Sequence, residues 1–240
     1  MKKLLTILLI AGTTQTFGQN IQLHYDLRHS LDPAHQATNY PSMTFEYFKN
    51  IDTLESGSFL FKMQSDLNGQ HKNVSQVFVQ LSQTLRFWKP KVYLSLNYTG
   101  GVGVAAGQYG YYLTNSFAAG VSYPFQWKGA WLSASVLYRY NAFAEGSHDT
   151  QVIFYFGKGL WNYKVFIAGS FVGWTENKNQ GNDFTAGQHG KKVAFFGDPQ
   201  VWLKVRKGFS IGSRINVYYH VINMESRVQI YPTIGVKYQF

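Results

Sequence analysis

The feature that most constrains this chain is an alternation of apolar and polar residues that recurs along most of its length. Near the start, Leu23 and Tyr25 alternate with His24 and Asp26. A period of two is typical of β-strands with one apolar and one polar face. The alternation predicts twelve strands, over residues 21–28, 43–48, 59–64, 76–87, 92–99, 113–123, 132–141, 152–156, 163–171, 198–205, 211–219 and 228–240. No segment after residue 18 approaches the roughly 20 apolar residues that a membrane-spanning helix needs.

Charged residues keep to the polar face of these strands. Every second residue of a strand belongs to the same face, and this odd or even position is its parity. By parity the polar face carries Asp26, Glu46, Asp66, Asp198, Arg28, Lys62, Arg86, Arg139, Lys164, Lys204, Arg214 and Lys237. In a transmembrane barrel the apolar face meets lipid, where one charge costs about 2–4 kcal/mol near the midplane. The sequence therefore predicts an all-β fold, a twelve-stranded antiparallel transmembrane β-barrel of the outer-membrane type. A soluble β-sandwich is the alternative, because it would bury the apolar face and expose the polar one.

The connections between the strands form two alternating classes. Turns are expected at 51–57, 89–91, 124–129, 157–161 and 206–208, and mostly longer polar loops at 29–39, 68–73, 100–110, 142–149, 176–191 and 222–227. The eighth strand, at 152–156, is expected to be short. Outer-membrane barrels have short periplasmic turns and longer external loops, and an even number of strands places both chain ends on the periplasmic side.

Both ends of the sequence fit export to the outer membrane of a Gram-negative cell. Residues 1–18 combine a basic start, an apolar run from Leu4 to Ala11 and small residues near Gly18, which predicts a cleaved signal peptide. Residues 19–240 are expected to form a single barrel domain. The terminal Phe240 resembles the signal by which the barrel-assembly machinery recognises its substrates. The chain has no cysteine, which excludes a lipid anchor and disulfide bonds.

Composition narrows the classes of partner. Aromatic residues make up 18% of the chain, which suits the aromatic girdles at the two lipid–water interfaces of a barrel. The formal net charge is +10, but the basic residues are spread through the strands, so outer-membrane lipid and not nucleic acid is the expected partner. The histidines lack metal-ligand spacing, and neither a metal nor a cofactor is expected.

The polar face would line the lumen of such a barrel. Barrels of about eight strands are nearly filled and those of about 16 to 18 are open, so twelve strands predict a narrow lumen that side chains partly block. Aromatic residues on the same face suit a small planar solute. The predicted pore-lining residues are Asp26, Arg28, Glu46, Lys62, Arg86, Arg139, Asp198, Gln200, Trp202, Arg214 and Tyr218. The alternative is that these charges pair with one another and stabilise a plugged barrel.

Four segments carry a family resemblance. They are Phe195-Phe196-Gly197-Asp198-Pro199-Gln200-Val201-Trp202, Leu23-His24-Tyr25-Asp26, Leu85-Arg86-Phe87-Trp88 and Pro232-Thr233-Ile234-Gly235-Val236-Lys237-Tyr238-Gln239-Phe240. These segments resemble the Tsx-like nucleoside-channel superfamily, most closely its branch in Gram-negative bacteria outside the enterics. The resemblance spans nearly the whole mature chain and implies a barrel for the diffusion of nucleosides and related small solutes. On this reading Asp198 would supply an acceptor, Gln200 an amide and Trp202 a stacking face.

The sequence therefore predicts a porin-like channel for small polar solutes, with nucleosides as the first candidates, and no enzymatic activity. Two other classes stay open. Lipid hydrolysis needs a serine and a histidine together on the lipid-facing wall, but His24 and His220 share the lumen parity with the strand serines. A non-conducting structural or adhesive barrel would act chiefly through the loop at 176–191.

Overall fold

The computed structural model describes residues 18–50, 57–69, 73–86, 88–105, 109–142, 145–181, 183, 185–222 and 226–240. The expected signal segment, residues 1–18, therefore lies outside the described residues except for Gly18. The elements are β1 (Gly18–Asp26), α2 (Arg28–Leu31), β2 (Tyr40–Asn50), β3 (Ser58–Asp66), β4 (Gln76–Leu85), β5 (Tyr93–Val104), β6 (Gly110–Trp127), β7 (Ala130–Asn141), β8 (Ser147–Leu160), β9 (Val165–Asn177), β10 (Lys191–Gly197), β11 (Gln200–Arg206), β12 (Phe209–Tyr219) and β13 (Gln229–Gln239). Within these ranges, no helix is long and apolar enough to cross a bilayer.

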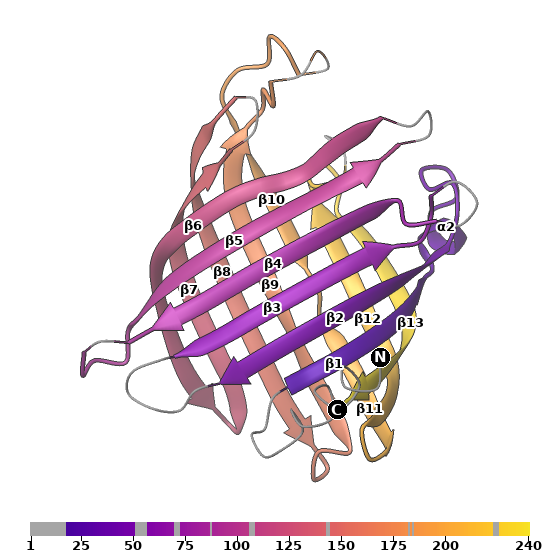
Figure 1. Cartoon of the computed structure of the whole chain (residues 1–240), viewed down its shortest axis with the longest axis vertical. Coiled ribbons are helices and arrows are strands. Elements are labelled where there is room, and N and C mark those ends of the chain that lie inside the picture. The colour runs from indigo at the N-terminus through magenta and orange to yellow at the C-terminus, as the bar shows by residue number, and fades with distance from the viewer. Residues whose placement is uncertain are drawn as a thin grey trace, which may run out of the picture.

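The strands form one closed antiparallel barrel (Figure 1). The sheet closes because β1 pairs with β13 as well as with β2. Leu23, for example, lies opposite Met43 on one side and opposite Val236 on the other. The Phe240 backbone N–H donates to the Gln19 carbonyl at 3.2 Å, so the first and last strands meet at their ends. The predicted antiparallel barrel is confirmed.

One strand of the barrel is interrupted. The thirteen strand segments β1 to β13 therefore form a barrel of twelve strands. Both β10 and β11 pair with β9 on one side and with β12 on the other, so they are two halves of one strand. The break falls at Asp198 and Pro199, and a proline has no N–H to give to the ladder. The Asp198 N–H donates to the Ser170 carbonyl at 3.0 Å, and the Pro199 carbonyl accepts from the Ile215 N–H at 2.9 Å.

The sixth strand runs further than the alternation predicts. β6 extends to Trp127 and meets β7 through a two-residue turn at Lys128 and Gly129, where a longer connection was expected at 124–129. Both turn residues have positive φ, 47° and 74°, which is the backbone geometry that matches the twist of two paired strands.

The eighth strand was predicted to be short, and this prediction is wrong, because β8 spans 14 residues. Gly157 and Gly159, which suggested a turn, stay paired with β9. The chain reverses instead at 161–164, where Trp161 and Tyr163 adopt φ of 49° and 61°. The strand after the long loop also starts early, since β10 begins at Lys191 and the loop spans only 178–190.

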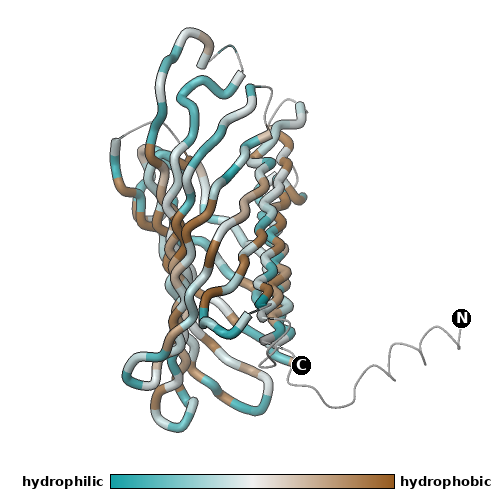
Figure 2. The backbone as a smooth tube through the Cα atoms, turned by 90° about the vertical axis from the view of Figure 1, so that its left-hand side faces the viewer, coloured by the Kyte–Doolittle hydropathy of each residue, from teal (hydrophilic) through white to brown (hydrophobic). Residues whose placement is uncertain are grey.

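The side chains that face outward are mainly apolar and exposed, as lipid contact requires. In β1, Ile21, Leu23 and Tyr25 are exposed, whereas the residues between them are buried. Similar residues surround the barrel, among them Met43, Leu96, Val121, Val136, Val152, Val201, Ile211, Ile230 and Ile234. Figure 2 shows hydrophilic residues gathered at the loops and turns, with apolar residues recurring along the strands between them.

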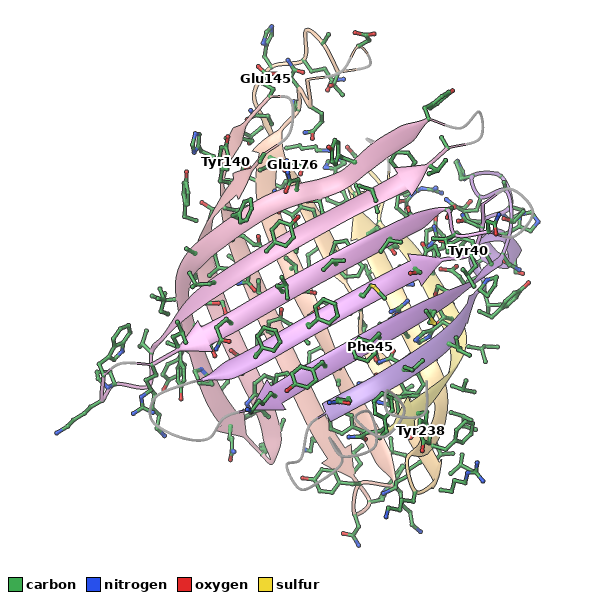
Figure 3. All side chains as sticks on the ribbon, viewed as in Figure 1. Tyr40, Phe45, Tyr140, Glu145, Glu176 and Tyr238 are labelled. Carbon is green, nitrogen blue, oxygen red and sulfur yellow. The ribbon has the colours of Figure 1, made fainter. Side chains whose placement is uncertain are left out.

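Exposed aromatic residues gather towards both ends of the barrel. The turn end is the one with the turns 128–129, 161–164 and 207–208, and the loop end is the one with the loops 27–39 and 178–190. Tyr140 lies towards the loop end and Tyr238 towards the turn end (Figure 3). Two such aromatic girdles are typical of barrels that span a membrane.

The interior is lined mostly by polar side chains, and the barrel is flattened. Its broad side faces the viewer in Figure 1 and its narrower side in Figure 2. One apolar cluster inside the barrel consists of Ala118, Leu137 and Ile153, with Tyr155 and Val172 packed against it. Because the two broad walls approach each other, their side chains meet across the lumen.

Candidate functional site in the barrel lumen

An ion pair crosses the lumen. Lys62 projects from β3, and its Nζ lies 2.6 Å from Oδ2 of Asp198, at the break between β10 and β11. Around the barrel, these positions are separated by β12, β13, β1 and β2 in one direction and by β4 to β9 in the other. Both side chains are buried. Asp198 Oδ1 also accepts hydrogen bonds from the N–H and the hydroxyl of Ser170, at 2.8 and 2.7 Å. The pair thus joins opposite walls.

Two further contacts join the broad walls. Gln80 of β4 donates from Nε2 to the Tyr155 hydroxyl of β8 at 3.0 Å. The rings of Phe48 in β2 and Trp131 in β7 meet edge to face, with 6.2 Å between their centroids. Neither pair belongs to adjacent strands, so each contact spans the lumen. Strand side chains therefore narrow this lumen at more than one place.

Arg214 of β12 lies close enough to Asp198 to interact with it electrostatically, and it is 1% exposed. Its Nη1 donates to Thr44 Oγ1 of β2 at 3.3 Å, and its backbone N–H donates to Thr233 Oγ1 of β13 at 3.2 Å. Its buried Nε has no hydrogen-bond partner among the described residues. A buried charged donor without an acceptor is costly, so packing alone does not explain this arginine.

Two strands, β12 and β13, lie between β11 and β1 in the barrel wall. The side chains of Trp202 in β11 and His24 in β1 pack over one glycine from each of these two strands. Gly212 pairs with Trp202, Gly235 pairs with His24, and the two glycines pair with each other. The Trp202 and His24 rings meet edge to face, 5.5 Å between centroids. A glycine within a strand often marks such a close approach, because a larger residue would occupy the space of its neighbour.

Trp202 is enclosed by other side chains as well. Its indole N–H donates to Gln200 Oε1 at 2.9 Å, and Lys237 Nζ lies 4.4 Å from the centroid of its ring. Lys237 Nζ also lies 5.7 Å from the ring centroid of Phe166. Since Trp202 is 1% exposed, a solute that stacks on its ring must first displace a neighbour such as Lys237.

Gly212→Ala is expected to destabilise the barrel by about 1–3 kcal/mol, because a Cβ there would overlap the Val201 carbonyl and the Trp202 ring. Gly173→Ala in β9 is the matched control, since the nearest heavy atom to its Cβ would be the Ala194 carbonyl oxygen, 4.0 Å away. Urea unfolding in lipid vesicles measures both variants. Equal stabilities would show that Gly212 is not needed to accommodate Trp202.

A second group of charges lies near the loop end. Arg28 of α2 makes a bidentate contact with Asp26, in which Nε is 3.1 Å from Oδ1 and Nη2 is 2.9 Å from Oδ2. The Arg28 guanidinium also lies 4.7 Å from the ring centroid of Tyr40 and 5.1 Å from that of Tyr231. The Tyr218 ring lies 6.2 Å from the Tyr231 ring. Arg28 is therefore held firmly in place.

Arg139 of β7 belongs to a third group, also near the loop end. Its Nη1 is 3.7 Å from Oε2 of Glu176, whose Oε1 is 2.9 Å from Lys192 Nζ. The Trp174 indole N–H donates to Glu176 at 2.9 Å, and the Arg139 guanidinium lies 5.4 Å from the Trp174 ring centroid. The predicted Arg139 is therefore part of a paired network.

Asp32 links two loops at the loop end. Its carboxylate accepts hydrogen bonds from Arg227 Nη2 at 3.0 Å and from the Tyr231 hydroxyl at 3.2 Å, and it contacts His35 Nδ1 at 2.6 Å. The pKa of Asp32 is lowered, chiefly by its hydrogen bond with His35. The hydrogen bond with Tyr231 and the positive charge of Arg227 lower it further. The stability from this link is present above the ordinary aspartate pKa and is lost as the pH falls through the lowered one.

Two predicted residues lie apart from these groups. Arg86 follows β4 at the turn end, where its Nε donates to the Trp88 carbonyl at 2.9 Å and its Nη2 to the Lys89 carbonyl. It therefore braces the connection to β5 and does not join the central residues. Glu46 is half-buried and accepts a hydrogen bond from Asn20 at 3.3 Å.

The neutral partners of the central charges are Thr44, Ser170 and Thr233, and the sequence did not predict them. They lie on the polar face, but alternation alone does not distinguish them from other polar residues. Their contacts join strands that are distant in sequence, so no local signal identifies them. Gly212 and Gly235 did leave a signal, because glycine on the lumen face of a strand suggests close approach of another group.

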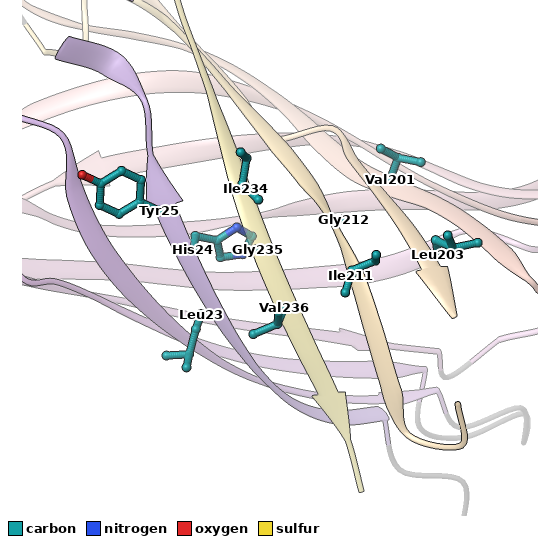
Figure 4. A pocket seen from close by; sticks show the side chains of 10 residues that line it. All are labelled: Leu23, His24, Tyr25, Val201, Leu203, Ile211, Gly212, Ile234, Gly235 and Val236. Atoms are coloured by element: carbon teal, nitrogen blue, oxygen red, sulfur yellow. The ribbon is translucent and has the colours of Figure 1, made fainter. Parts of the chain in front are cut away.

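The described residues contain no group of three or more His, Asp or Glu side chains that could hold a metal ion. The lipid-facing wall does carry a groove of about 680 Å³ over β1, β11, β12 and β13 (Figure 4). Its lining comprises Leu23, His24, Tyr25, Val201, Leu203, Ile211, Gly212, Ile234, Gly235 and Val236. Because the groove is largely apolar and faces outward, we assign it to lipid contact.

Comparison with known proteins shows the family and the fold. A family model described as a domain of unknown function (DUF5020) matches residues 18–240. No curated protein matches the chain. The solved NanC porin structure has a TM-score of 0.54 at 7% identity, covering 92% of this chain and 100% of that one. The KdgM porin gives 0.48 at 7% identity, covering 92% and 99%. At such identities the NanC likeness shows a shared barrel fold alone.

Proposed function

Because the chain belongs to the family described as a domain of unknown function (DUF5020) and folds as a porin-type barrel, we propose that it is a narrow channel for passive diffusion of small polar solutes across an outer membrane. The observation that carries the proposal is the set of charged side chains buried in the lumen, above all Lys62, Asp198 and Arg214. Ionisable residues inside a membrane are costly and typically mark ion or solute pathways.

The proposal includes the route to the membrane. We expect residues 1–18 to be removed as a signal peptide and the barrel-assembly machinery to recognise the strand that ends at Phe240. The turn end would face the periplasm, as in other outer-membrane barrels. The exposed apolar wall and the aromatic residues towards both ends support a lipid environment.

The basic residues of the lumen favour neutral or anionic solutes. Lys62, Arg214 and Lys237 all lie near enough to His24 to interact with it, and Asp198 neutralises only the first through a direct contact. The resemblance to nucleoside channels makes nucleosides the first neutral solutes to test. Liposome swelling with nucleosides, sugars, amino acids and organic anions would rank these classes.

Planar-bilayer recording tests the channel directly. We expect discrete conductance steps from the wild-type protein and larger steps from the double variant Lys62→Ala/Asp198→Ala, because that variant removes a contact between opposite walls. The matched control, Asp32→Ala/Arg227→Ala, removes an ion pair from the loops and should leave the step size near that of the wild type. Silence from the wild type and from the double variant would contradict the proposed channel.

A non-conducting barrel is the second candidate, and contacts that join opposite walls, such as Lys62 with Asp198 and Gln80 with Tyr155, favour it. In that case bilayers stay silent, and removal of the loop 178–190 should abolish any adhesion to surfaces or cells. Lipid hydrolysis is tested in the same preparation, because Ser226 Oγ lies 3.3 Å from His220 Nε2 in an exposed loop. Hydrolysis that disappears in Ser226→Ala would replace the channel proposal.

A further inference from the structure

We propose that Arg214 forms an anion-binding subsite in the lumen, which takes one carboxylate or phosphate group of a small solute. The inference deepens the proposed function and rests on it for transport, although binding itself can be measured without transport. It starts from a guanidinium group that the fold buries and leaves without an anionic partner.

The guanidinium group of Arg214 has more donors than the protein supplies acceptors. Its N–H groups form a planar fork that matches an oxyanion. The side-chain hydrogen bond that the described residues provide runs from Nη1 to Thr44 Oγ1, at 3.3 Å, and the buried Nε has no acceptor. Arg214 is 1% exposed, so bulk water has little access to replace the missing acceptors.

The neighbouring acid does not supply the missing acceptor. Asp198 interacts electrostatically with Arg214, but its carboxylate is turned towards other donors. Oδ2 accepts from Lys62 Nζ at 2.6 Å, and Oδ1 accepts from the N–H and the hydroxyl of Ser170. Among the contacts of the described residues, no ion pair includes Arg214. The buried Nε is therefore left for an anion from outside the protein, which, as at Trp202, must displace a neighbouring side chain to reach it.

The surroundings of Arg214 attract such an anion. Lys62 and Lys237 lie near enough to His24 to interact with it, as Arg214 does, so the three cations share one region of the lumen. Lys237 Nζ lies over two aromatic rings and, within the described chain, forms no ion pair. The same region holds two acids, Asp198 in contact with Lys62 and Glu46 near enough to Lys237 to interact with it, so the cations outnumber the acids. A narrow passage with an excess of one sign of charge concentrates counter-ions.

The other arginines predicted to line the pore differ from Arg214. Arg28 is engaged by the bidentate Asp26 carboxylate, and Arg139 lies 3.7 Å from the carboxylate of Glu176. Arg86 donates to two backbone carbonyls at the turn end. The buried Nη1 of Arg139 also lacks a hydrogen-bond partner among the described residues, but Arg139 forms an ion pair with Glu176. Of this predicted set, Arg214 is the arginine that has neither an ion pair nor a carbonyl acceptor for its side chain among the described residues.

Binding is tested with inorganic phosphate and with acetate on the full-length folded barrel in detergent, at constant ionic strength. We expect both anions to raise the midpoint of thermal unfolding of the wild type. Arg214→Gln should weaken the apparent affinity about tenfold, as expected for the loss of a charge-assisted hydrogen bond. Arg214→Lys keeps the charge without the planar fork and should give an intermediate affinity. Lys204→Gln removes an exposed base near the turn end and should respond like the wild type.

The same variants in planar bilayers separate the subsite from the channel. The wild type should prefer anions to K⁺, and Arg214→Gln should reduce this permeability ratio about tenfold. Phosphate-dependent stabilisation without current would support the subsite and refute the channel. If the wild type conducts current, but phosphate and acetate stabilise the wild type and Arg214→Gln equally, the subsite is refuted and the channel is supported. If Arg214→Gln fails to fold, Arg214→Lys decides, and an affinity for phosphate equal to that of the wild type overturns the subsite.

Discussion

Asp198→Ala is expected to lower the free energy of unfolding of the barrel by about 3–5 kcal/mol. The substitution leaves Lys62 buried in the lumen without its anionic partner. It also removes the acceptor for the N–H and the hydroxyl of Ser170, next to the interruption between β10 and β11. Reversible urea unfolding of the purified protein in lipid vesicles would measure this loss.

Two companion variants make the result specific to the ion pair. Glu46→Ala removes another lumen-facing acid, one that lies opposite Lys62 in the β2–β3 register and interacts with Lys237. Glu46 accepts a 3.3 Å hydrogen bond from Asn20 but forms no ion pair among the described residues. Its expected cost is below about 1 kcal/mol. Lys62→Ala/Asp198→Ala removes both charges and should be more stable than Asp198→Ala alone. If Asp198→Ala costs no more than Glu46→Ala, the ion pair does not stabilise the barrel.

Val136→Arg is expected to destabilise the barrel by about 2–4 kcal/mol, because it places a charge in the hydrocarbon region of the bilayer. Val136 is 55% exposed, lies within β7, and is flanked by Val121 of β6 and Val152 of β8. An exposed position of this kind in a water-soluble protein would accept arginine at little cost. Unfolding in lipid vesicles therefore reports whether lipid contacts this wall.

The matched control is Val74→Arg. Val74 is 49% exposed, a fraction close to that of Val136, but it lies in the loop before β4. Its substitution should change stability by less than about 0.5 kcal/mol. Equal effects at the two positions would mean that the outer wall is not in contact with lipid, and the proposed channel would then have no membrane to cross.

The alternation was sufficient to predict the strand number and the antiparallel barrel, because a wall between lipid and a polar lumen requires a period of two. It was not sufficient to predict where strands end. Gly157 and Gly159 resemble turn residues, but in the barrel they pair with β9, and the reversal occurs at 161–164. The end of a strand depends on how far its neighbours extend, and that information is not local.

Parity also placed the charged residues inside the barrel without showing which of them meet. Asp26 and Arg28 are two residues apart, so their pairing follows from local geometry. Lys62 and Asp198 are separated by 136 residues, and they meet because the barrel is flattened. The sequence also could not show that Arg214 Nε lacks a hydrogen-bond partner, because this becomes clear only when the positions of all neighbouring acceptors are known.

The contacts that narrow this lumen are made by side chains of the strands, and this sets the timescale of any passage through it. Exposed side chains exchange rotamers within picoseconds to nanoseconds, but Lys62 is buried, and Gln80 and Phe48 are half-buried. Each of these three side chains must break its contact across the lumen before it can turn. Openings produced in this way would be small, and such a barrel would exclude bulky molecules without moving its backbone.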